Sequence, residues 1–187
     1  MKDWLKLANS FEKHILRINP SCSSQEIDVL EQELNSPLPQ PLRHFLEQAN
    51  GIGMMDFRIL GTADIIEQTR WHRERMLRQR DEYGENLEPE GRTPESEIVV
   101  SRDGSGDTCV IIQQGIVGKF DHETGKVMWI VASSFDHFLW FVLDDHKRRF
   151  CPDGTEKVGY RRSRRWPYTD LPWMLKQDPG LGAYRSE

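Results

Sequence analysis

The sequence predicts an α+β fold in which a mostly antiparallel sheet of about five to six strands packs against several helices. Apolar residues in the first 80 positions recur every three or four residues, which is the spacing of amphipathic helices. From residue 98 onward, short β-branched runs alternate with glycine-bearing turns, which is typical of antiparallel strands. This change of period along the chain predicts the α+β class.

The first half of the chain is predicted to hold four helices. Residues 1–20 form an amphipathic N-terminal helix, and the second helix begins at Ser23, which has capping-box spacing with Glu26. A proline-rich break precedes the third helix, which stops at the left-handed residue Gly51, and residues 63–80 form the fourth. The buried faces of the first three helices are predicted to contain Trp4, Ala8, Phe11, Ile15, Ile18, Ile27, Leu30, Leu34, Leu42, Phe45, Leu46 and Ala49.

The sheet is predicted to follow an acidic, turn-rich loop at residues 81–97, with one strand before it. The expected strands are residues 57–60, 98–100, 109–113, 116–120 and 127–132. Ser133 and Asp136 then repeat the capping-box spacing and begin a last helix. Its buried stripe is predicted to be Phe135, Phe138, Leu139 and Val142.

Three segments are expected along the chain: the N-terminal helix at residues 1–20, an α+β domain at 21–145, and a basic, aromatic-rich extension at 146–187. The extension contains several large apolar residues, so it is expected to pack on the same domain until Asp178, after which the chain is expected to be loose. It carries ten Lys and Arg against five Asp and Glu, so residues 1–145 carry fifteen against twenty-five.

The acidic body, within a net charge of −5, restricts the class of partner. Phosphate repulsion opposes general nucleic-acid binding, and a negative surface favours a basic protein partner, unless the acidic residues only aid solubility. The longest apolar run is residues 138–143, too short for a membrane span, so no membrane partner is expected.

Cysteine and histidine spacing predicts neither a disulfide framework nor a metal site. The three cysteines are few, odd in number and far apart, which favours a reducing cytoplasm. His122, His137 and His146 show no metal-ligand spacing with one another or with the cysteines. We therefore expect no metal and no other cofactor.

The segment 103–107, Asp-Gly-Ser-Gly-Asp, allows three interpretations. A phosphate loop is disfavoured because the Gly-Lys-Ser/Thr ending is missing, and a calcium loop because the regular ligand alternation is missing. Turn chemistry accounts for every residue, since glycine supplies positive φ and aspartate bonds the backbone. The sequence favours a tight turn between strands.

No catalytic constellation stands out, so the sequence predicts a protein that is not an enzyme. Ser133 and Ser134 lie at a strand-to-helix junction, where a nucleophilic serine can sit, but the G-x-S-x-G motif is absent. Helix capping explains both serines. Asp121 and Glu123 lie two positions apart at a strand end and are expected to form a local negative patch.

Several short motifs occur in an order that resembles the SUKH superfamily, the Smi/Knr group, over residues 21–145. They are Leu38-Pro39, Asn50-Gly51, Gly106-Asp107, Asp121-His122-Glu123 and Ser134-Phe135, with Glu31 or Glu33 as the acidic residue of the preceding helix. The resemblance implies an α+β domain that binds proteins. Many bacterial members resemble immunity proteins that neutralise secreted toxins, often nucleases, and fungal relatives resemble scaffolds in the control of cell-wall synthesis.

The resulting hypothesis is an immunity protein that binds and occludes a basic, nuclease-type toxin. The expected partner-binding residues are Asp103, Asp107, Asp121 and Glu123, together with Glu85, Glu88 and Glu90 and the rest of the acidic loop up to Glu97. A scaffold that binds a host protein is the alternative. Less favoured are a small hydrolase using Ser134 or His122, and a nucleic-acid binder using the arginines of the extension at residues 161–165 with Trp166.

Overall fold

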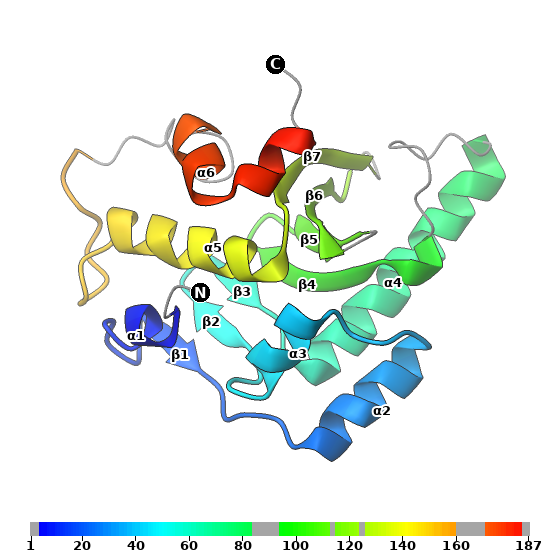
Figure 1. The fold of residues 1–187 in the computed structure, drawn as a ribbon, viewed down its shortest axis with the longest axis horizontal. Helices are drawn as coiled ribbons and strands as arrows, with labels where there is room; N and C mark the ends of the chain where they lie inside the picture. Colours follow the sequence, from blue (N-terminus) through cyan, green and yellow to red (C-terminus); the bar gives the residue numbers. More distant parts are fainter. Residues whose placement is uncertain (1–3, 84–93, 113–114, 124–125, 160–170, 185–187) are drawn as a thin grey trace.

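A computed structural model describes residues 4–83, 94–112, 115–123, 126–159 and 171–184, and shows a seven-stranded antiparallel sheet with helices on both faces (Figure 1). The strands follow one another in chain order, so the sheet is a meander. The strands are β1 (Leu16–Ile18), β2 (Ile52–Met54), β3 (Phe57–Ile59), β4 (Ile98–Asp103), β5 (Thr108–Ile111), β6 (Val117–Asp121) and β7 (Lys126–Ala132). The α+β class is confirmed, with seven strands in place of five or six.

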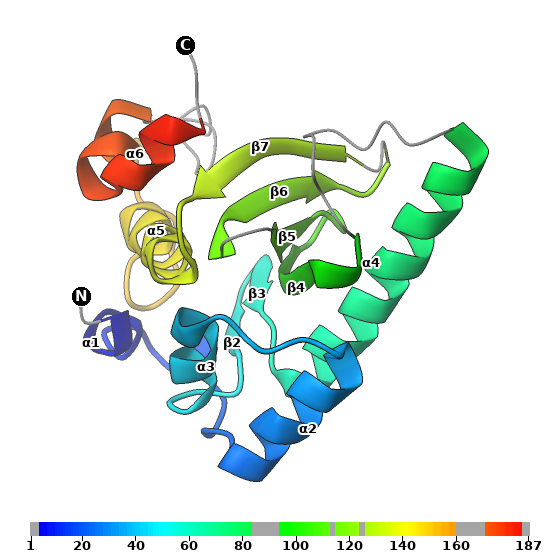
Figure 2. The ribbon, with the colours of Figure 1, turned by 45° about the vertical axis from the view of Figure 1, so that its right-hand side comes forward.

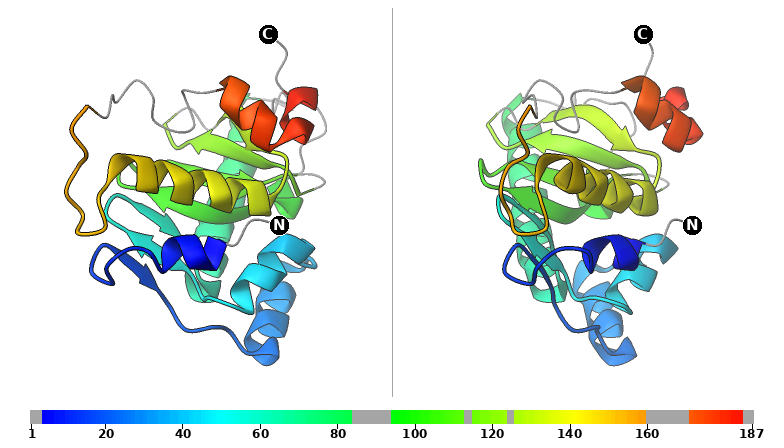
Figure 3. Two further views of the ribbon diagram at one scale, coloured as in Figure 1. Left: turned by 60° about the vertical axis from the view of Figure 1, so that its left-hand side comes forward. Right: turned by 90° about the vertical axis from the view of Figure 1, so that its left-hand side faces the viewer.

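Six α-helices accompany the sheet in the described part of the chain. They are α1 (Trp4–Ala8), α2 (Ser24–Leu34), α3 (Gln40–Leu46), α4 (Thr62–Tyr83), α5 (Phe135–Arg149) and α6 (Leu171–Gln177), with short 3-10 helices at Pro94–Ser96 and Pro179–Ala183. The helix α5 lies across one face of the sheet, and the long helix α4 lies on the other (Figures 2 and 3). No helix among these is both long and apolar enough to cross a membrane.

The prediction of one N-terminal helix over residues 1–20 is wrong. The helix α1 ends at Ala8, and residues 16–18 instead form the edge strand β1, with Leu16 opposite Met54 of β2. The Ser10 hydroxyl donates to the Leu7 carbonyl at 2.7 Å, which satisfies a helix-end acceptor. The predicted apolar residues Trp4, Ala8, Phe11 and Ile15 are nevertheless buried, because a turn after the short helix keeps them on the core side.

The pair Asn50-Gly51 has a different role from the one predicted. The helix α3 already ends at Leu46, so Gly51 does not directly follow it, although its φ is +92°. Gly51 lies so close to Gly61 that a Cβ would be 2.8 Å from the Gly61 nitrogen. The Asn50 side chain accepts a 2.7 Å hydrogen bond from the Thr62 amide, so the pair fixes the start of α4.

The capping box that begins α2 is confirmed. The Ser23 hydroxyl accepts from the Glu26 amide at 3.3 Å, and the Glu26 carboxylate accepts from the Ser23 amide at 2.8 Å. The charge-favouring hydrogen bonds from Ser23 hold the pKa of Glu26 below its usual value. The cap fixes the helix that turns Ile27, Leu30 and Leu34 into the core.

We expect Ser23→Ala to lower the free energy of unfolding by about 1 kcal/mol, because it leaves amide groups of the first turn without their cap. Chemical denaturation checks this: the midpoint should fall, while the dependence of the unfolding free energy on denaturant concentration should be the same as in the wild type. The matched control is Ser24→Ala, since Ser24 is exposed and is already inside the helix. Equal losses in the two variants would show that the cap is not the cause.

The start of α5 and the C-terminal segment also differ from expectation. The residue that caps α5 is Ser134, whose hydroxyl accepts from the His137 amide, while Ser133 donates to Asp178. Asp178 is fully buried and precedes a 3-10 helix whose Leu181 is also fully buried. The expectation of a loose chain from Asp178 is therefore wrong. The arginines at residues 161–165 and Trp166 lie outside the described residues.

A single cluster of buried apolar side chains extends from Trp4 to Leu181. The predicted stripe of α5 is buried: Phe135, Phe138, Leu139 and Val142. On the opposite face α4 packs its His72 ring edge-on against Phe120, with ring centroids 4.5 Å apart. The sheet thus has a helical layer on each side over its later strands, and this rigid support positions the turns described next.

Candidate partner-binding surface

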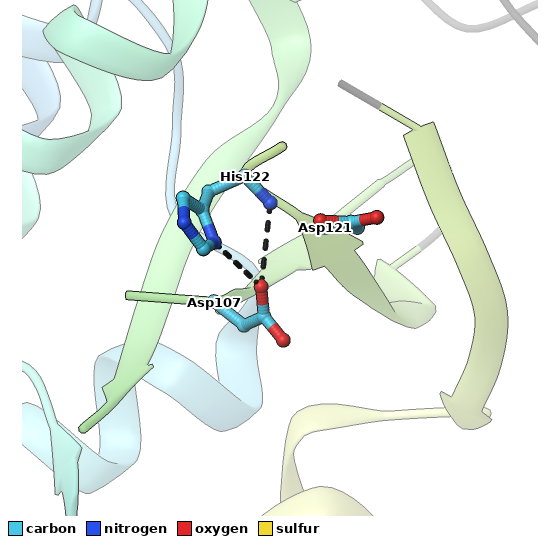
Figure 4. A group of neighbouring side chains, drawn as sticks. All are labelled: Asp107, Asp121 and His122. Atoms are coloured by element: carbon cyan, nitrogen blue, oxygen red, sulfur yellow. Dashed lines mark hydrogen bonds and ion pairs between the residues drawn. The ribbon is translucent and has the colours of Figure 1, made fainter. Parts of the chain in front are cut away.

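Two strand ends bring the predicted acidic residues together at one end of the sheet. The strands β5 and β6 are antiparallel, with Thr108 opposite Phe120. The turn before β5 and the turn after β6 therefore lie side by side. Figure 4 shows the result for Asp107, directly before β5, and Asp121, the last residue of β6. We call Asp103, Asp107, Asp121 and Glu123 the acidic cluster.

The segment between β4 and β5 is a tight turn, as predicted. The Asp103 carboxylate accepts hydrogen bonds from the amides of Ser105 and Asp107, each at 3.0 Å, and from the Ser105 hydroxyl at 2.6 Å. Gly106 has φ of +98°, a conformation that side chains disfavour. Hydrogen bonds within residues 103–107 therefore account for the shape of this turn.

A lysine that the sequence did not single out lies between two members of the acidic cluster, Asp103 and Asp107. The side chain of Lys119 is 5% exposed, and its ammonium lies 2.5 Å from the Asp103 carboxylate and 3.4 Å from the Asp107 carboxylate. Burial disfavours the charged amine, but the hydrogen bond that Lys119 donates to Asp103 and the negative charges of Asp103 and Asp107 outweigh burial and raise the pKa of Lys119 above its usual value. The only signal in the sequence is a single cation inside an apolar strand run.

The same contacts shift the titration of the neighbouring groups. Burial alone would raise the pKa of Asp103, but the hydrogen bonds from Lys119 and Ser105 outweigh it and hold that pKa below the usual range. Burial raises the pKa of the Cys109 thiol to about 11. Asp103 is therefore ionised and paired at neutral pH, while Cys109 is a neutral thiol.

Asp107 is shared between Lys119 and His122. The His122 ring nitrogen Nδ1 lies 2.8 Å from one Asp107 oxygen, and the His122 amide donates to that oxygen at 3.3 Å (Figure 4). The ring also lies against Gly106, where a Cβ would be 3.7 Å from it. These contacts join the two turns into one unit.

The other two members of the acidic cluster are Asp121 and Glu123, which follow each other closely at the end of β6. The Glu123 amide donates to the Asp121 carboxylate at 2.8 Å, and Arg75 of α4 donates to the Glu123 carbonyl at 3.3 Å. The Glu123 side chain is exposed and Asp121 is half-buried. Glu123 is therefore the most accessible carboxylate of the acidic cluster, while Lys119 partly neutralises Asp103 and Asp107.

Asp107, Asp121 and His122 offer ligand atoms that lie within 4.8 Å of one another, which is compatible with a cation site. Lys119 already places a positive charge beside Asp107, and the His122 nitrogen nearest to Asp107 is engaged with it. These groups satisfy one another, and we assign no metal to them.

The serines at the start of α5 do not form a catalytic triad. The Nδ1 atom of His137 lies 3.1 Å from the Ser134 hydroxyl and 3.4 Å from the Asp178 carboxylate. A triad histidine uses one ring nitrogen for the serine and the other for the acid. One nitrogen serves both contacts here, so the geometry is that of a helix cap anchored to a buried carboxylate.

The acidic loop contributes less than expected where it is described. Glu97 is 1% exposed, and its carboxylate lies 2.6 Å from the buried His72 ring, so it cannot contact a partner. The sequence predicted a surface position for Glu97, because nothing near it in the sequence indicates that its partner is His72, a buried residue of the helix α4. Glu85, Glu88 and Glu90 lie outside the described residues.

Comparison with known proteins identifies the family. The model of the SMI1 / KNR4 family (SUKH-1) matches residues 21–139, more than half of the chain, so the chain belongs to this family. A comparison with curated proteins gave no match. The resemblance inferred from the short motifs is thereby confirmed.

The family motifs have distinct places in the structure. Leu38-Pro39 precedes α3, and Ser134-Phe135 begins α5, so these motifs position helices. Gly106-Asp107 and Asp121-His122-Glu123, which are far apart in the sequence, meet in the two turns of the acidic cluster. This convergence makes the acidic cluster the best-defined candidate surface.

Proposed function

We propose that this protein is a non-enzymatic binding module, and specifically an immunity protein that occludes a basic, nuclease-type toxin. Membership of the SMI1 / KNR4 family is consistent with a role in binding another protein. The observation that supports the finer proposal is the meeting of two turns that bring four carboxylates to one end of the sheet.

The acidic cluster has the physical properties of an electrostatic docking site. Its two turns are held by internal hydrogen bonds and by the buried Lys119. They are therefore already ordered, and little conformational entropy is lost when a partner binds. Asp121 and Glu123 then supply charges that speed encounter with a basic surface and select against acidic ones. Occlusion of the toxin requires only a stable complex with no chemical step.

The proposed partner can be sought directly in the native host. The tagged protein is purified at low salt, and the proteins that elute with it are identified by mass spectrometry. We expect one basic toxin domain in stoichiometric amount, released as the salt concentration rises. Recovery without any such domain, or a complex indifferent to salt, would contradict the proposal.

Two further functions differ in what they require. A scaffold would recruit a host protein, and its gene would not neighbour a toxin gene. A hydrolase would lose turnover on Ser134→Ala or His122→Ala, but the hydrogen bonds of these side chains are those of a cap and a turn.

A cytoplasmic location is part of the proposal, since all three cysteines are free thiols.

A further inference from the structure

A row of arginines crosses the first four strands on the face of the sheet opposite α5. The strand register places Arg17 of β1 opposite Gly53 of β2, Gly53 opposite Arg58 of β3, and Arg58 opposite Arg102 of β4. Residues paired across strands project from the same face. We call Arg17, Arg58 and Arg102 the arginine row.

The arginine row lies on an uncovered part of this face. The row continues through Thr108 to Phe120, where His72 of α4 covers it. All three arginines are exposed, so α4 does not extend over the first strands. Two adjoining hollows of about 360 and 370 Å³ lie there, and Arg58 and Met55 line both.

The charges of the arginine row are not balanced within the described residues. Arg58 and Arg102 lie directly opposite each other, which is an unfavourable like-charge pair on a sheet. In the described part of the chain neither forms an ion pair, and Arg17 donates only to the Asn19 amide oxygen at 3.1 Å.

The carboxylates that border the arginine row are mostly engaged elsewhere. Asp56 lies 2.6 Å from Arg149 of α5, and Asp103 lies 2.5 Å from Lys119. Asp64, in the first turn of α4, is the remaining acidic residue that lines the hollows. In the part of the chain that the structure describes, Asp64 is therefore the one carboxylate lining these hollows that forms no ion pair.

We propose that the arginine row binds an acidic peptide segment of a partner protein. Guanidinium groups recognise carboxylates through paired hydrogen bonds, and a carboxylate between Arg58 and Arg102 would relieve their repulsion. Gly53 has no side chain, and a Cβ there would meet no atom within 4 Å, so it leaves room for the segment. The exposed Met55 adds an apolar contact at the edge.

A short acidic peptide fits better than a nucleic acid. The protein carries a net charge of −5 and its acidic cluster borders the fourth strand, so a long polyanion is repelled over most of the surface. A peptide with two or three carboxylates meets only the arginine row. This inference is independent of the toxin proposal, because it concerns a different face and the opposite charge.

The test uses four fluorescent probes in anisotropy titrations at 20 and 150 mM NaCl: a decapeptide of alternating Glu and Ser, its Gln-Ser and Lys-Ser analogues, and a 20-nucleotide single-stranded DNA. We expect saturable binding of the Glu-Ser peptide and none of the Gln-Ser peptide. Arg58→Glu should weaken it by about tenfold or more, because one charge-assisted contact is lost and a repulsion is gained.

The matched control is Lys176→Glu, which makes the same change of charge at an exposed position of α6. We expect it to alter the affinity less than about twofold. Thermal melting of both variants confirms that they are folded. Absence of Glu-Ser binding, equal losses in the two variants, or stronger binding of the DNA than of the peptide would each overturn the proposal.

Discussion

Asp103→Asn should lower the free energy of unfolding at pH 7 by about 3 kcal/mol, because it leaves the buried Lys119 ammonium without its nearest counter-charge. Asp107, at 3.4 Å, compensates only in part. The asparagine still accepts the hydrogen bonds of the turn, so the loss reports the ion pair. Denaturant unfolding of the wild type and the variant measures it.

Lys119→Met is the matched partner of this substitution. It removes the buried charge and keeps much of the apolar stem, and the side chain of Asp103, which is 23% exposed, retains some solvent and its bonds within the turn. The loss should therefore be less than half of that in Asp103→Asn. Combining the two substitutions should recover part of the stability. Equal losses in both single variants, or a loss below about 0.5 kcal/mol in Asp103→Asn, would contradict the pairing.

The effect also has a defined pH dependence. The folded-state pKa of Asp103 is held below its unfolded value, so its contribution is fully present above the unfolded pKa of about 4. It is lost as pH falls through the still lower folded pKa. The stability difference between the wild type and Asp103→Asn should therefore shrink below about pH 4 and be constant from pH 5 to pH 8.

Asp178→Ala should lower the free energy of unfolding by about 2–4 kcal/mol, since it leaves two partly buried hydrogen-bond donors of Ser133 without their acceptor. The fully buried Asp178 carboxylate accepts from the Ser133 amide at 2.7 Å and from its hydroxyl at 2.5 Å. It thereby attaches the C-terminal segment to the end of β7. Besides the loss of stability, hydrogen exchange across residues 171–184 should become faster.

Two controls separate the carboxylate from the segment around it. Asp178→Asn keeps one acceptor oxygen and should lose less stability than the alanine variant. Lys176→Ala changes an exposed side chain of the neighbouring helix and should lie within about 0.5 kcal/mol of the wild type. An Asp178→Ala variant as stable as the wild type would show that the C-terminal segment is held by its apolar contacts alone.

Local patterns were sufficient for most of the fold. The capping box of Ser23 and Glu26, the turn at residues 103–107 and the buried stripe of α5 depend on residues close in sequence, and the structure confirms them. The strands β1 and β2 escaped prediction for local reasons. The residues before β1 have spacings that also fit a helix, and β2 is only three residues long with Gly53 at its centre.

The surface features could not be predicted in the same way, because they depend on strand register. Lys119 of β6 and Asp103 of β4 come close because both strands pair with β5, in a register that places Ser101, Cys109 and Lys119 side by side. The arginine row joins Arg17 to Arg58 through Gly53, and nothing near any of these residues in the sequence specifies that pairing. The acidic cluster was predicted residue by residue, but its partial neutralisation by a buried lysine was not.

The most direct test of the binding function is the affinity for the partner identified in the native host, measured by isothermal titration with the wild type and with Asp121→Asn/Glu123→Gln. These substitutions remove two charges and keep the Asp121 oxygen that accepts from the Glu123 amide. We expect one-to-one binding that weakens at least tenfold in the variant at 50 mM NaCl, with a smaller difference at 300 mM. Equal affinities of the two proteins at low salt would contradict the assignment of the acidic cluster as the binding surface.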